Sequence, residues 1–395
     1  MVTPRRAGTD GMVLKVSSRG AVPPFIVMDV LRAANERAAT GEDVLHLELG
    51  QPGTPAPSGV IEAAKRALDA EKIGYTEAFG IIELRERIAQ HYADTHGVAV
   101  SLDRIVVTTG SSGGFVLAFI AAFDAGDRVA LAAPGYPAYR NILLALGIEP
   151  VSLPAGPDSR FQPTVDLLER VDGNLDGLIV ASPSNPSGTM LSADELKKLA
   201  DYCHDQGIRL ISDEIYHGIT YSMAETTALG FAGEAVVINS FSKYFSMTGW
   251  RIGWMVAPED LLRSIECLKQ NLFISAPTLS QHAALSAFDC AAELDANVAR
   301  YARNRELLLT GLPKVGFTDF APADGAFYLY ADVSRLTNES EIFCRRMLRE
   351  TGVATAPGND FDPDRGRSFI RISFAGPTSD IEDAMARLEV WQGGK

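Results

Sequence analysis

The chain has 395 residues, of which 46% are hydrophobic and 22% are charged, and its net charge is −14 at pH 7. This is the composition of an ordinary folded protein, with enough apolar side chains for one large domain or two medium ones. An acidic chain without a lysine and arginine block disfavours nucleic acid as a partner, and no apolar run reaches the roughly 18–20 residues that span a bilayer.

The N-terminal segment carries basic residues but lacks the apolar stretch of a secretory signal, and we expect residues 1–12 to form a flexible tail. The four cysteines, at positions 203, 267, 290 and 344, are widely spaced and form no CxxC pair. This spacing predicts reduced thiols in a cytoplasmic protein rather than disulfides or zinc ligands, and we expect no metal.

The first regular pattern is that of a helix over residues 25–41. From about residue 101, short apolar strands alternate with Gly/Pro/Ser turns and amphipathic helices, such as those predicted at 115–123 and 192–207. In the second helix Ser192 is a good N-cap, with Glu195 three residues on, and Gly207 is a good stop. The predicted strands cover 104–109, 128–133, 177–182, 209–214, 236–241 and 253–257.

Apolar strands that alternate with helices predict an α/β fold whose large domain holds a mostly parallel sheet flanked by helices. From about residue 289 the pattern changes to longer helices (289–312 and 338–351) and short strands (327–333 and 368–374), which indicates a smaller α/β domain. We expect the N-terminal helix to pack with it. The predicted boundaries are an N-terminal arm, part of the small domain, at 13–48, the large domain at 49–288 and the small C-terminal domain at 289–395.

Ligands of such sheets bind at the carboxyl ends of the strands, so residues just after each strand are the candidates for chemistry. Lys243 follows the strand at 236–241, where partial desolvation would lower its pKa toward that of a usable nucleophile; the alternative is a surface lysine. Arg251 lies eight residues on, between glycines and tryptophans. A cation in so apolar a setting predicts a nearby anion, either a phosphate or a structural carboxylate.

The segment TTGSSGGFVLAF (108–119) is a strand, a Gly/Ser turn and a helix, and its free N–H groups with Ser111 and Ser112 suit a phosphate. It has neither the Walker lysine nor a GxGxxG pattern, which disfavours a nucleotide. At the end of another strand, Asp213 could pair with a protonated ring nitrogen and Tyr216 could donate a hydrogen bond into the same crevice. The alternatives are an N-cap and a half-buried tyrosine.

For three further residues, each taken alone, the sequence allows both a ligand-binding role and a purely structural role. Asn185 follows a strand within a rigid Pro/Gly loop, or belongs to a simple turn. Tyr136 could lie flat against an aromatic ligand, or pack in the core. Arg371 lies in a short apolar strand, where it would meet a ligand carboxylate or form an internal salt bridge. The conjunction of ligand-type residues after so many strands favours a single binding crevice.

The segment SFSKYFSMTGWRIGW (240–254) is close to the lysine signature of the class I/II aminotransferases. The motifs NPSG (185–188) and DEIY (213–216) and the arginine of RIS follow in the order of that family. From about residue 12 to 391 the chain resembles these pyridoxal 5'-phosphate (PLP) enzymes of fold type I, the aspartate aminotransferase superfamily. The resemblance implies a seven-stranded sheet, PLP as the cofactor, and cis peptide bonds before Pro134 and Pro186.

The resemblance also implies roles for the cofactor residues. Lys243 would form a Schiff base with the cofactor and serve as general acid and base, and Asp213 would keep the ring nitrogen protonated. Asn185 and Tyr216 would bind the phenolic oxygen, and Tyr136 would stack on the ring. The phosphate would be held by Ser111, Ser112, Ser240 and Arg251.

Substrate and subunit roles follow in the same way. Arg371 and Asn185 would bind the substrate, with Arg371 on its α-carboxylate and Gly50 beside it. Tyr75 matches the tyrosine that the partner subunit of the family sends to the phosphate, which implies a homodimer with shared active sites.

The implied activity is transfer of the amino group of an L-amino acid to a 2-oxo acid, with 2-oxoglutarate the expected acceptor, by a ping-pong mechanism through Lys243. We see no second arginine for a distal carboxylate, which disfavours a dedicated aspartate enzyme and leaves aromatic, aliphatic or broad donors open. One alternative is a PLP-dependent carbon–sulfur β-lyase, which would use the same cofactor residues. A non-enzymatic PLP sensor is disfavoured, because no DNA-binding module precedes the fold and the chain is acidic.

Overall fold

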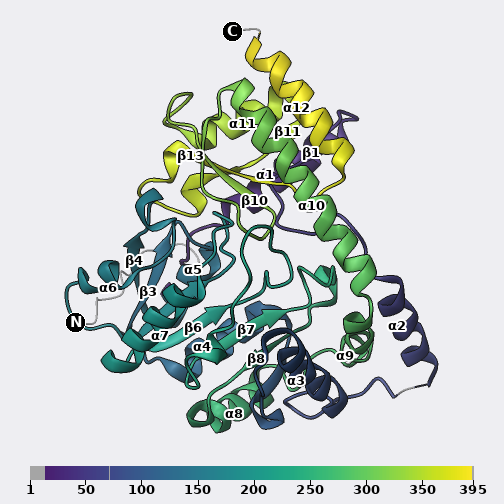
Figure 1. Cartoon of the computed structure of the whole chain (residues 1–395), viewed down its shortest axis with the longest axis vertical. Helices are drawn as coiled ribbons and strands as arrows, with labels where there is room; N and C mark the ends of the chain where they lie inside the picture. Colours follow the sequence, from purple (N-terminus) through teal and green to yellow (C-terminus); the bar gives the residue numbers. More distant parts are fainter. Residues whose placement is uncertain (1–13, 71, 394–395) are drawn as a thin grey trace.

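A computed structural model describes residues 14–70 and 72–393, and its largest feature is a seven-stranded sheet (Figure 1). The strand order is β2-β8-β7-β6-β5-β3-β4, and of these seven only β8 runs antiparallel to its neighbours. The predicted mostly parallel sheet is therefore confirmed. Its strands are β2 (Ile105–Thr108), β3 (Arg128–Ala133), β4 (Glu149–Pro154), β5 (Gly177–Ala181), β6 (Arg209–Asp213), β7 (Val236–Ser240) and β8 (Gly253–Val256).

Six of these strands coincide with predicted ones to within one residue at each end, and β4 was not located from the sequence. β4 is an edge strand that pairs only with β3, and most of its side chains are at least partly exposed. It also contains Pro150 and Pro154, which an edge strand tolerates because one of its sides needs no ladder hydrogen bonds. Its sequence therefore lacks the apolar run that marks the buried strands.

Side chains of the buried strands alternate between two cores, one on each face of the sheet. Ile105 and Val107 enter one core, whereas Val106 between them enters the other. Helices α2, α3, α7 and α9 supply residues to the first core, and α4, α5 and α8 to the second. The helices that accompany this sheet are α2 (Ser58–Ala70), α3 (Ile82–His96), α4 (Gly110–Ala122), α5 (Pro137–Leu146), α6 (Val165–Glu169), α7 (Ala193–Gln206), α8 (Leu262–Leu272) and α9 (Thr278–Leu285).

Two helix predictions can be compared in detail. The capping of α7 is confirmed: the Ser192 hydroxyl accepts from Glu195 N, the Glu195 carboxylate accepts from Ser192 N, and Gly207 ends the helix with φ +67°. The predicted start of α4 at residue 115 is wrong, because the helix already begins at Gly110. Ser111 and Ser112 therefore lie in its first turn rather than in a turn before it, which aims free N–H groups at the sheet edge.

A second, smaller set of elements lies above the sheet in Figure 1. A four-stranded sheet has the order β12-β13-β10-β9, and a separate parallel pair joins β1 to β11. The predicted elements at 289–312, 327–333, 338–351 and 368–374 are present within three residues at each end. The bounds are α1 (Ile26–Ala39), β1 (Leu45–His46), α10 (Ala291–Gly311), β9 (Asp319–Phe320), β10 (Tyr328–Asp332), α11 (Ser340–Thr351), β11 (Val353–Ala354), β12 (Ala356–Pro357), β13 (Phe369–Ser373) and α12 (Thr378–Gly393).

The N-terminal helix packs with the C-terminal segment, as expected. Ala34 of α1 forms a small buried cluster with Leu348 and Ala354. The helix α10 runs from this upper group of elements down toward α9, so the chain passes between the two groups without a break at residue 289 (Figure 1). The domain boundaries stay a prediction, and the tail expected at 1–12 lies outside the described residues.

None of the helices within residues 14–70 and 72–393 combines the length and the hydrophobicity that crossing a membrane requires. All four cysteines are free, and Cys203 and Cys344 are buried. The expectation of reduced thiols therefore agrees with their placement.

Candidate active site

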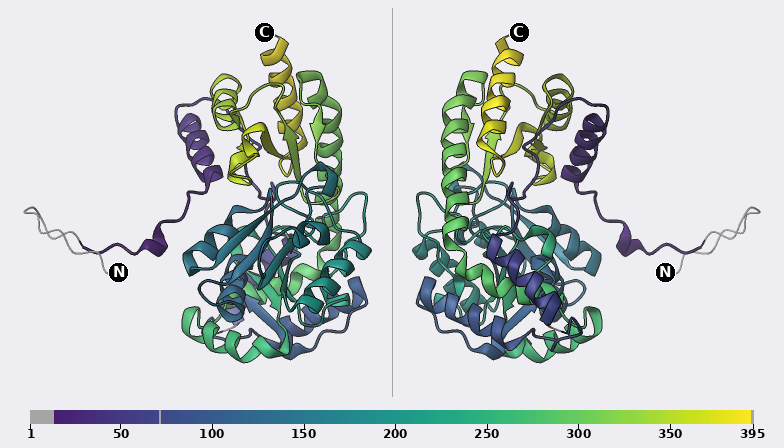
Figure 2. Two further views of the ribbon diagram at one scale, coloured as in Figure 1. Left: turned by 90° about the vertical axis from the view of Figure 1, so that its left-hand side faces the viewer. Right: turned by 90° about the vertical axis from the view of Figure 1, so that its right-hand side faces the viewer.

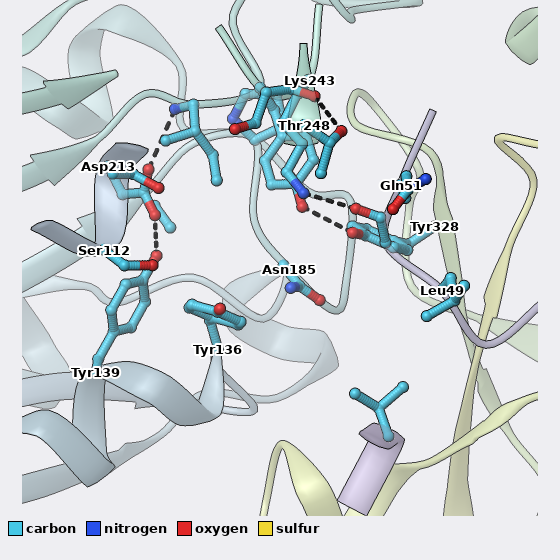
Figure 3. A pocket seen from close by; sticks show the side chains of 18 of the residues that line it. Leu49, Gln51, Ser112, Tyr136, Tyr139, Asn185, Asp213, Lys243, Thr248 and Tyr328 are labelled. Atoms are coloured by element: carbon cyan, nitrogen blue, oxygen red, sulfur yellow. Dashed lines mark hydrogen bonds between the residues drawn. The ribbon is translucent and has the colours of Figure 1, made fainter. Parts of the chain in front are cut away.

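One cavity collects residues from the sheet edge at which β2, β3, β5, β6 and β7 end and β8 begins, together with residues of the smaller group of elements (Figure 3). Among the predicted residues it brings together Ser111, Ser112, Tyr136, Asn185, Asp213, Tyr216, Lys243, Arg251, Gly50 and Arg371. Its other lining residues are Phe25, Val27, Met28, Leu49, Gln51, Tyr139, Ala181, Pro183, Ile215, Ser242, Thr248 and Tyr328.

Lys243 projects into this cavity from the loop after β7. Its Nζ donates a hydrogen bond to the carbonyl oxygen of Gly50 at 2.6 Å. Burial lowers the pKa of Lys243 from 10.5 to about 8, and the positive charge of Arg371 acts in the same direction, whereas the negative charge of Asp213 opposes it. A useful fraction of this amine is thus neutral near physiological pH, as a nucleophile or a base requires.

Asp213 ends β6 and is 3% exposed. Its carboxylate accepts hydrogen bonds from the hydroxyl of Tyr139 and, at 3.1 Å, from Ile215 N. Burial raises the pKa of Asp213 to about 6, and both hydrogen bonds and the charge of Lys243 counteract that rise. Such a carboxylate can hold a cationic group in the cavity.

Tyr139 was missed by the sequence analysis. It lies in the first turn of α5, three residues after Tyr136 at the N-cap; both residues line the cavity, and their ring centroids are 5.3 Å apart with an edge-on contact. The signal that could have found it is this helical spacing, because the second tyrosine of APGYPAY shares the face of the first.

The first turn of α4 and Arg251 form the cationic end of the cavity. The Arg251 guanidinium lies so close to Gly110 that a Cβ at that residue would collide with it, and Gly110 itself has φ +71°. The environment of Arg251 differs from the prediction, since its side chain is exposed rather than enclosed by apolar groups. Within the described ranges no carboxylate lies at ion-pair distance from it, and Nη1 donates to Thr248 O at 3.1 Å.

Ser240 and Tyr75 do not line the cavity of this protomer. The Ser240 hydroxyl is buried behind Ser242, within 2.9 Å of the Ser242 hydroxyl and 3.2 Å of Ile252 O. Tyr75 is 82% exposed on the surface.

Arg371 enters from β13 and is 2% exposed. Nη1 donates to Asn185 Oδ1 at 2.9 Å, Nη2 donates to the carbonyl oxygen of Glu48, and the buried Nε has no hydrogen-bond partner among the described residues. The guanidinium carbon lies 4.5 Å from the ring centroid of Tyr328 and 4.8 Å from that of Phe361. The alternative of an internal salt bridge is not seen, because none of the ion pairs within 14–70 and 72–393 includes Arg371.

Tyr216 and Gly50 complete the wall around Lys243. The hydroxyls of Tyr216 and Tyr328 are 2.7 Å apart, and burial raises the pKa of Tyr216 well above its usual value. A Cβ at Gly50 would collide with the Tyr328 hydroxyl, so this close approach of the backbone requires glycine. The cis peptide bonds predicted before Pro134 and Pro186 are confirmed, and a third before Pro183 was not predicted.

Comparisons with known proteins agree with this site. The sequence model of the family described as aminotransferase class I and II matches residues 42–388. Valine–pyruvate aminotransferase of Mycobacterium tuberculosis (strain ATCC 25618 / H37Rv) is 54% identical over 384 residues, which cover 96% of this chain and 99% of that protein.

Two solved structures extend the comparison. A crystal structure of an aminotransferase from Mycobacterium tuberculosis has a TM-score of 0.95 at 53% identity and covers 97% of this chain and 100% of its own. Aspartate aminotransferase from Thermus thermophilus with maleate has a TM-score of 0.90 at 29% identity and covers 96% and 100%.

One cavity of a fold that these enzymes share thus holds a lysine with a lowered pKa, a buried carboxylate and an arginine that forms no ion pair within the described part of the chain. The family match spans most of the chain, and the relatives with this fold are aminotransferases that depend on PLP. The chain belongs to the class I and II aminotransferases, and it is a PLP-dependent transaminase that moves the amino group of an amino acid to a 2-oxo acid.

Proposed function

We propose that this transaminase uses an aliphatic amino acid of the valine class as donor and a small 2-oxo acid such as pyruvate as acceptor. The observation that carries the proposal is the buried Arg371, which has no carboxylate partner in the described chain and shares the cavity with an apolar wall. That wall is made of Phe25, Val27, Met28 and Leu49. The name of the 54% identical relative, a valine–pyruvate aminotransferase, points the same way.

The charges around the cavity also favour a substrate with a single carboxylate. The cations that line it in this protomer are Lys243, Arg251 and Arg371. We assign Lys243 and Arg251 to the cofactor, and Arg371 is then the cation that remains for the substrate α-carboxylate. Its planar fork suits a carboxylate, and an apolar side chain would lie against the wall at little cost. The earlier expectation of 2-oxoglutarate as acceptor is tested in the same assay as pyruvate.

The residues present fit PLP. The cofactor supplies an electron-accepting ring that stabilises negative charge at the substrate α-carbon. We infer that Lys243 attaches it covalently, that Asp213 pairs with its ring nitrogen, and that Asn185 and Tyr216 bind its phenolic oxygen. The first turn of α4 with Ser111 and Ser112 suits its phosphate, as does Arg251, which forms no ion pair with a described carboxylate, while Tyr136 suits the ring face. Ser240 would act through Ser242, since it does not reach the cavity.

The chain's own part of the reaction is to orient the substrate and to move one proton. Arg371 and Asn185 hold the carboxylate, which fixes the α-carbon relative to Lys243. Lys243 with a pKa of about 8 accepts the α-proton as a neutral amine and returns it. The surrounding tyrosines, Tyr136, Tyr216 and Tyr328, exclude water from the reacting atoms.

We further infer a homodimer with shared sites. Exposed apolar side chains gather near residues 68–75 and 272–274: Leu68 is 60% exposed, Tyr75 82%, Leu272 51% and Ile274 47%. These segments are neighbours, because Thr278 donates a hydrogen bond to the carbonyl oxygen of Gly74. Residues 14–24 are exposed throughout, pass alongside α5, where Asn141 Nδ2 donates to Pro23 O at 3.4 Å, and lie at the outer side of the protomer (Figure 2). A second copy would cover such a surface. The free thiols support a cytoplasmic location.

A substrate panel tests the donor and the acceptor. Purified holoenzyme receives valine, alanine, phenylalanine or aspartate with pyruvate or 2-oxoglutarate, and mass spectrometry quantifies both products. We expect the highest kcat/KM for valine with pyruvate. Faster turnover of aspartate with 2-oxoglutarate would refute the assignment. Release of pyruvate and ammonia from a sulfur amino acid, without a 2-oxo acid, would favour the β-lyase instead.

The role of Arg371 is tested with a matched pair of variants. Arg371→Lys keeps the charge but loses the fork, so we expect kcat/KM for valine to fall by about 100-fold with PLP retention unchanged. Arg305→Lys is the control, because Arg305 also donates to a backbone carbonyl, at 2.8 Å, and lies over a tyrosine ring, but it does not line the cavity. Equal losses in both variants would show that the effect is structural.

A further inference from the structure

Three side chains with metal-binding atoms meet beside the active-site turn, although the sequence analysis expected no metal. His96 ends α3, His217 lies in the turn after β6, and Glu225 lies in the loop that follows. One nitrogen or oxygen atom of each lies within 4.8 Å of the corresponding atoms of the other two. His96 Nε2 is 3.9 Å from Glu225 Oε1, and the rings of His96 and His217 have centroids 5.4 Å apart.

His217 is the feature that calls for a ligand. Its side chain is 3% exposed, and within the described residues neither ring nitrogen has a hydrogen-bond partner of normal geometry. The backbone of Ser182 is near, but it does not meet the distance and angle of a normal hydrogen bond. Buried polar groups are nearly always satisfied, so an imidazole that faces a second imidazole and a carboxylate without a bond requires an explanation.

Two further contacts hold the cluster in an orientation that suits an ion. Glu214 Oε2 lies 3.6 Å from His217 Nδ1 and has no hydrogen-bond partner among the described residues, whereas Glu214 Oε1 accepts from Ala228 N at 2.8 Å and from the Ser212 hydroxyl at 3.0 Å. A carboxylate behind one ring nitrogen is the usual arrangement for a histidine whose other nitrogen binds a metal. Glu225 Oε2 accepts from Gly218 N, which leaves Oε1 toward His96.

We propose that His96, His217 and Glu225 bind one divalent ion of the zinc class. Two imidazoles and one carboxylate are typical zinc ligands at about 2.0–2.2 Å, and they disfavour Mg²⁺ and Ca²⁺, which take oxygen ligands. Ligand atoms of a tetrahedral site at those lengths lie roughly 3.3–3.6 Å apart, so the cluster closes on the ion with small side-chain rotations. A water would complete the four positions.

The ion would be structural. It would tie the end of α3 to the turn that follows Asp213 and Tyr216, and to the loop that contains Glu225. This site is distinct from the cavity around Lys243 and does not depend on the choice of amino donor.

Zinc content of the holoenzyme tests the proposal directly. Protein without a histidine tag is dialysed against a chelator, equilibrated with zinc chloride and dialysed again, and zinc is measured by plasma mass spectrometry. We expect one zinc per chain in the wild type and in His204→Ala, and most of the zinc lost in His96→Ala and Glu225→Gln. His204 is the matched control, because it is an exposed histidine 2.6 Å from a glutamate, Glu234.

Two further measurements complete the test. Zinc should raise the Tm of the wild type and of His204→Ala but not that of His96→Ala, and Glu214→Gln should bind zinc about 10–100-fold more weakly. If the variants do not fold, an anomalous-scattering map of wild-type crystals, recorded at the zinc edge, shows whether zinc occupies the site. A peak between the three side chains supports the site. A zinc-free wild type, or equal zinc in His96→Ala, overturns it.

Discussion

The hydroxyl of Tyr139 controls the environment of Asp213. The pKa of Asp213 is raised to about 6 because burial outweighs the opposing effect of the hydrogen bonds from Tyr139 and from Ile215 N. Tyr139→Phe would remove one bond to a buried carboxylate, so the pKa of Asp213 should rise further. Between about pH 8 and pH 6, a larger share of the Asp213 carboxyl is then protonated in the variant than in the wild type. A protonated carboxyl is neutral and no longer holds a cationic ring.

We therefore expect Tyr139→Phe to weaken PLP binding by about tenfold near pH 7, and the deficit should grow toward lower pH. Equilibrium dialysis of PLP at a series of pH values measures it. Tyr92→Phe is the control, since the Tyr92 hydroxyl accepts a buried bond from Trp254 Nε1 at 3.1 Å away from the cavity. A deficit that is independent of pH would argue against control through Asp213.

Lys269 of α8 is a buried charge without a partner in the described residues. It is 1% exposed, its Nζ has no hydrogen bond, and burial lowers its pKa from 10.5 to about 8. Between these two values the unfolded chain carries a proton that the folded chain lacks, so stability rises with pH there. Below about pH 8 Lys269 is protonated in both the folded and the unfolded chain, and its buried charge then lowers the free energy of unfolding by the full amount.

Lys269→Met should accordingly raise stability at pH 7 by about 2–3 kcal/mol, and the advantage should vanish as the pH approaches 10.5. Urea unfolding at several pH values follows this difference. The exposed Lys314 supplies the control, and Lys314→Met should change little at any pH. An advantage of Lys269→Met that persists above pH 10.5 would point to packing instead of charge.

At the scale of elements, one carboxylate positions α1 over the cavity. Asp360 accepts from Ile26 N at 3.1 Å and from Val27 N at 3.0 Å, and so satisfies the N-terminus of the helix that supplies Val27 and Met28 to the apolar wall. Asp360→Asn replaces one acceptor oxygen by an N–H donor, so one of the two bonds is lost.

For Asp360→Asn we expect a KM for valine that is several-fold higher with kcat nearly unchanged, and a loss of about 1 kcal/mol in urea unfolding. Steady-state kinetics and an unfolding curve measure both. Asp29→Asn in the first turn of the same helix also removes a negative charge, but it removes no hydrogen bond to a backbone N–H of α1, so KM should match the wild type. A fall in kcat alone would place the role of Asp360 elsewhere.

Elements differ in how well the sequence predicts them. Strands buried on both faces, such as β3 and β7, are predictable because their apolar runs allow no other placement. β4 is missed because an exposed edge strand with two prolines lacks that signal. The two-residue strands β1, β9, β11 and β12 depend on long-range pairing, for example of Leu45 with Val353, which no local pattern encodes.

The residues of the candidate site likewise differ in how well the sequence predicts them. Lys243, Asp213 and Arg371 were found because they stand at strand ends or within apolar strands. The bond from Tyr139 and the carbonyl of Glu48 that receives Arg371 depend on how α5 and the segment before Gly50 are oriented, and that is set by packing. The exposure of Arg251 was missed because its neighbours in sequence are apolar, whereas in the fold its side chain reaches the surface and donates to Thr248 O.

At the scale of the whole molecule, the proposed homodimer with shared sites makes a specific prediction about mixed dimers. One subunit carries Lys243→Ala and the other Tyr75→Ala. If the partner subunit's Tyr75 completes each site, one site of the mixed dimer has both changes and the other has neither. Joint refolding should then restore about a quarter of the wild-type activity, because half of the dimers are mixed and each has one intact site.

The activity of the mixture is compared with that of each variant refolded alone, and sedimentation confirms the assembly. If the activity of the mixture exceeds the sum of the activities of the two variants refolded alone, the result supports active sites that are shared between subunits. If Tyr75 acted within its own subunit, every site would carry one change, and mixing would restore nothing.

The placement of the four thiols allows the opening of each hydrophobic core to be measured by cysteine alkylation. Cys203 lies in the core beneath the large sheet and Cys344 in the core of the smaller group, and burial raises the pKa of each to about 12. Neither reacts with an alkylating reagent until its own core opens, whereas Cys267 and Cys290 are partly exposed. Timed alkylation of the unaltered chain therefore reads the two cores separately: equal rates at positions 203 and 344 mean that they open as one unit, and unequal rates identify the weaker half.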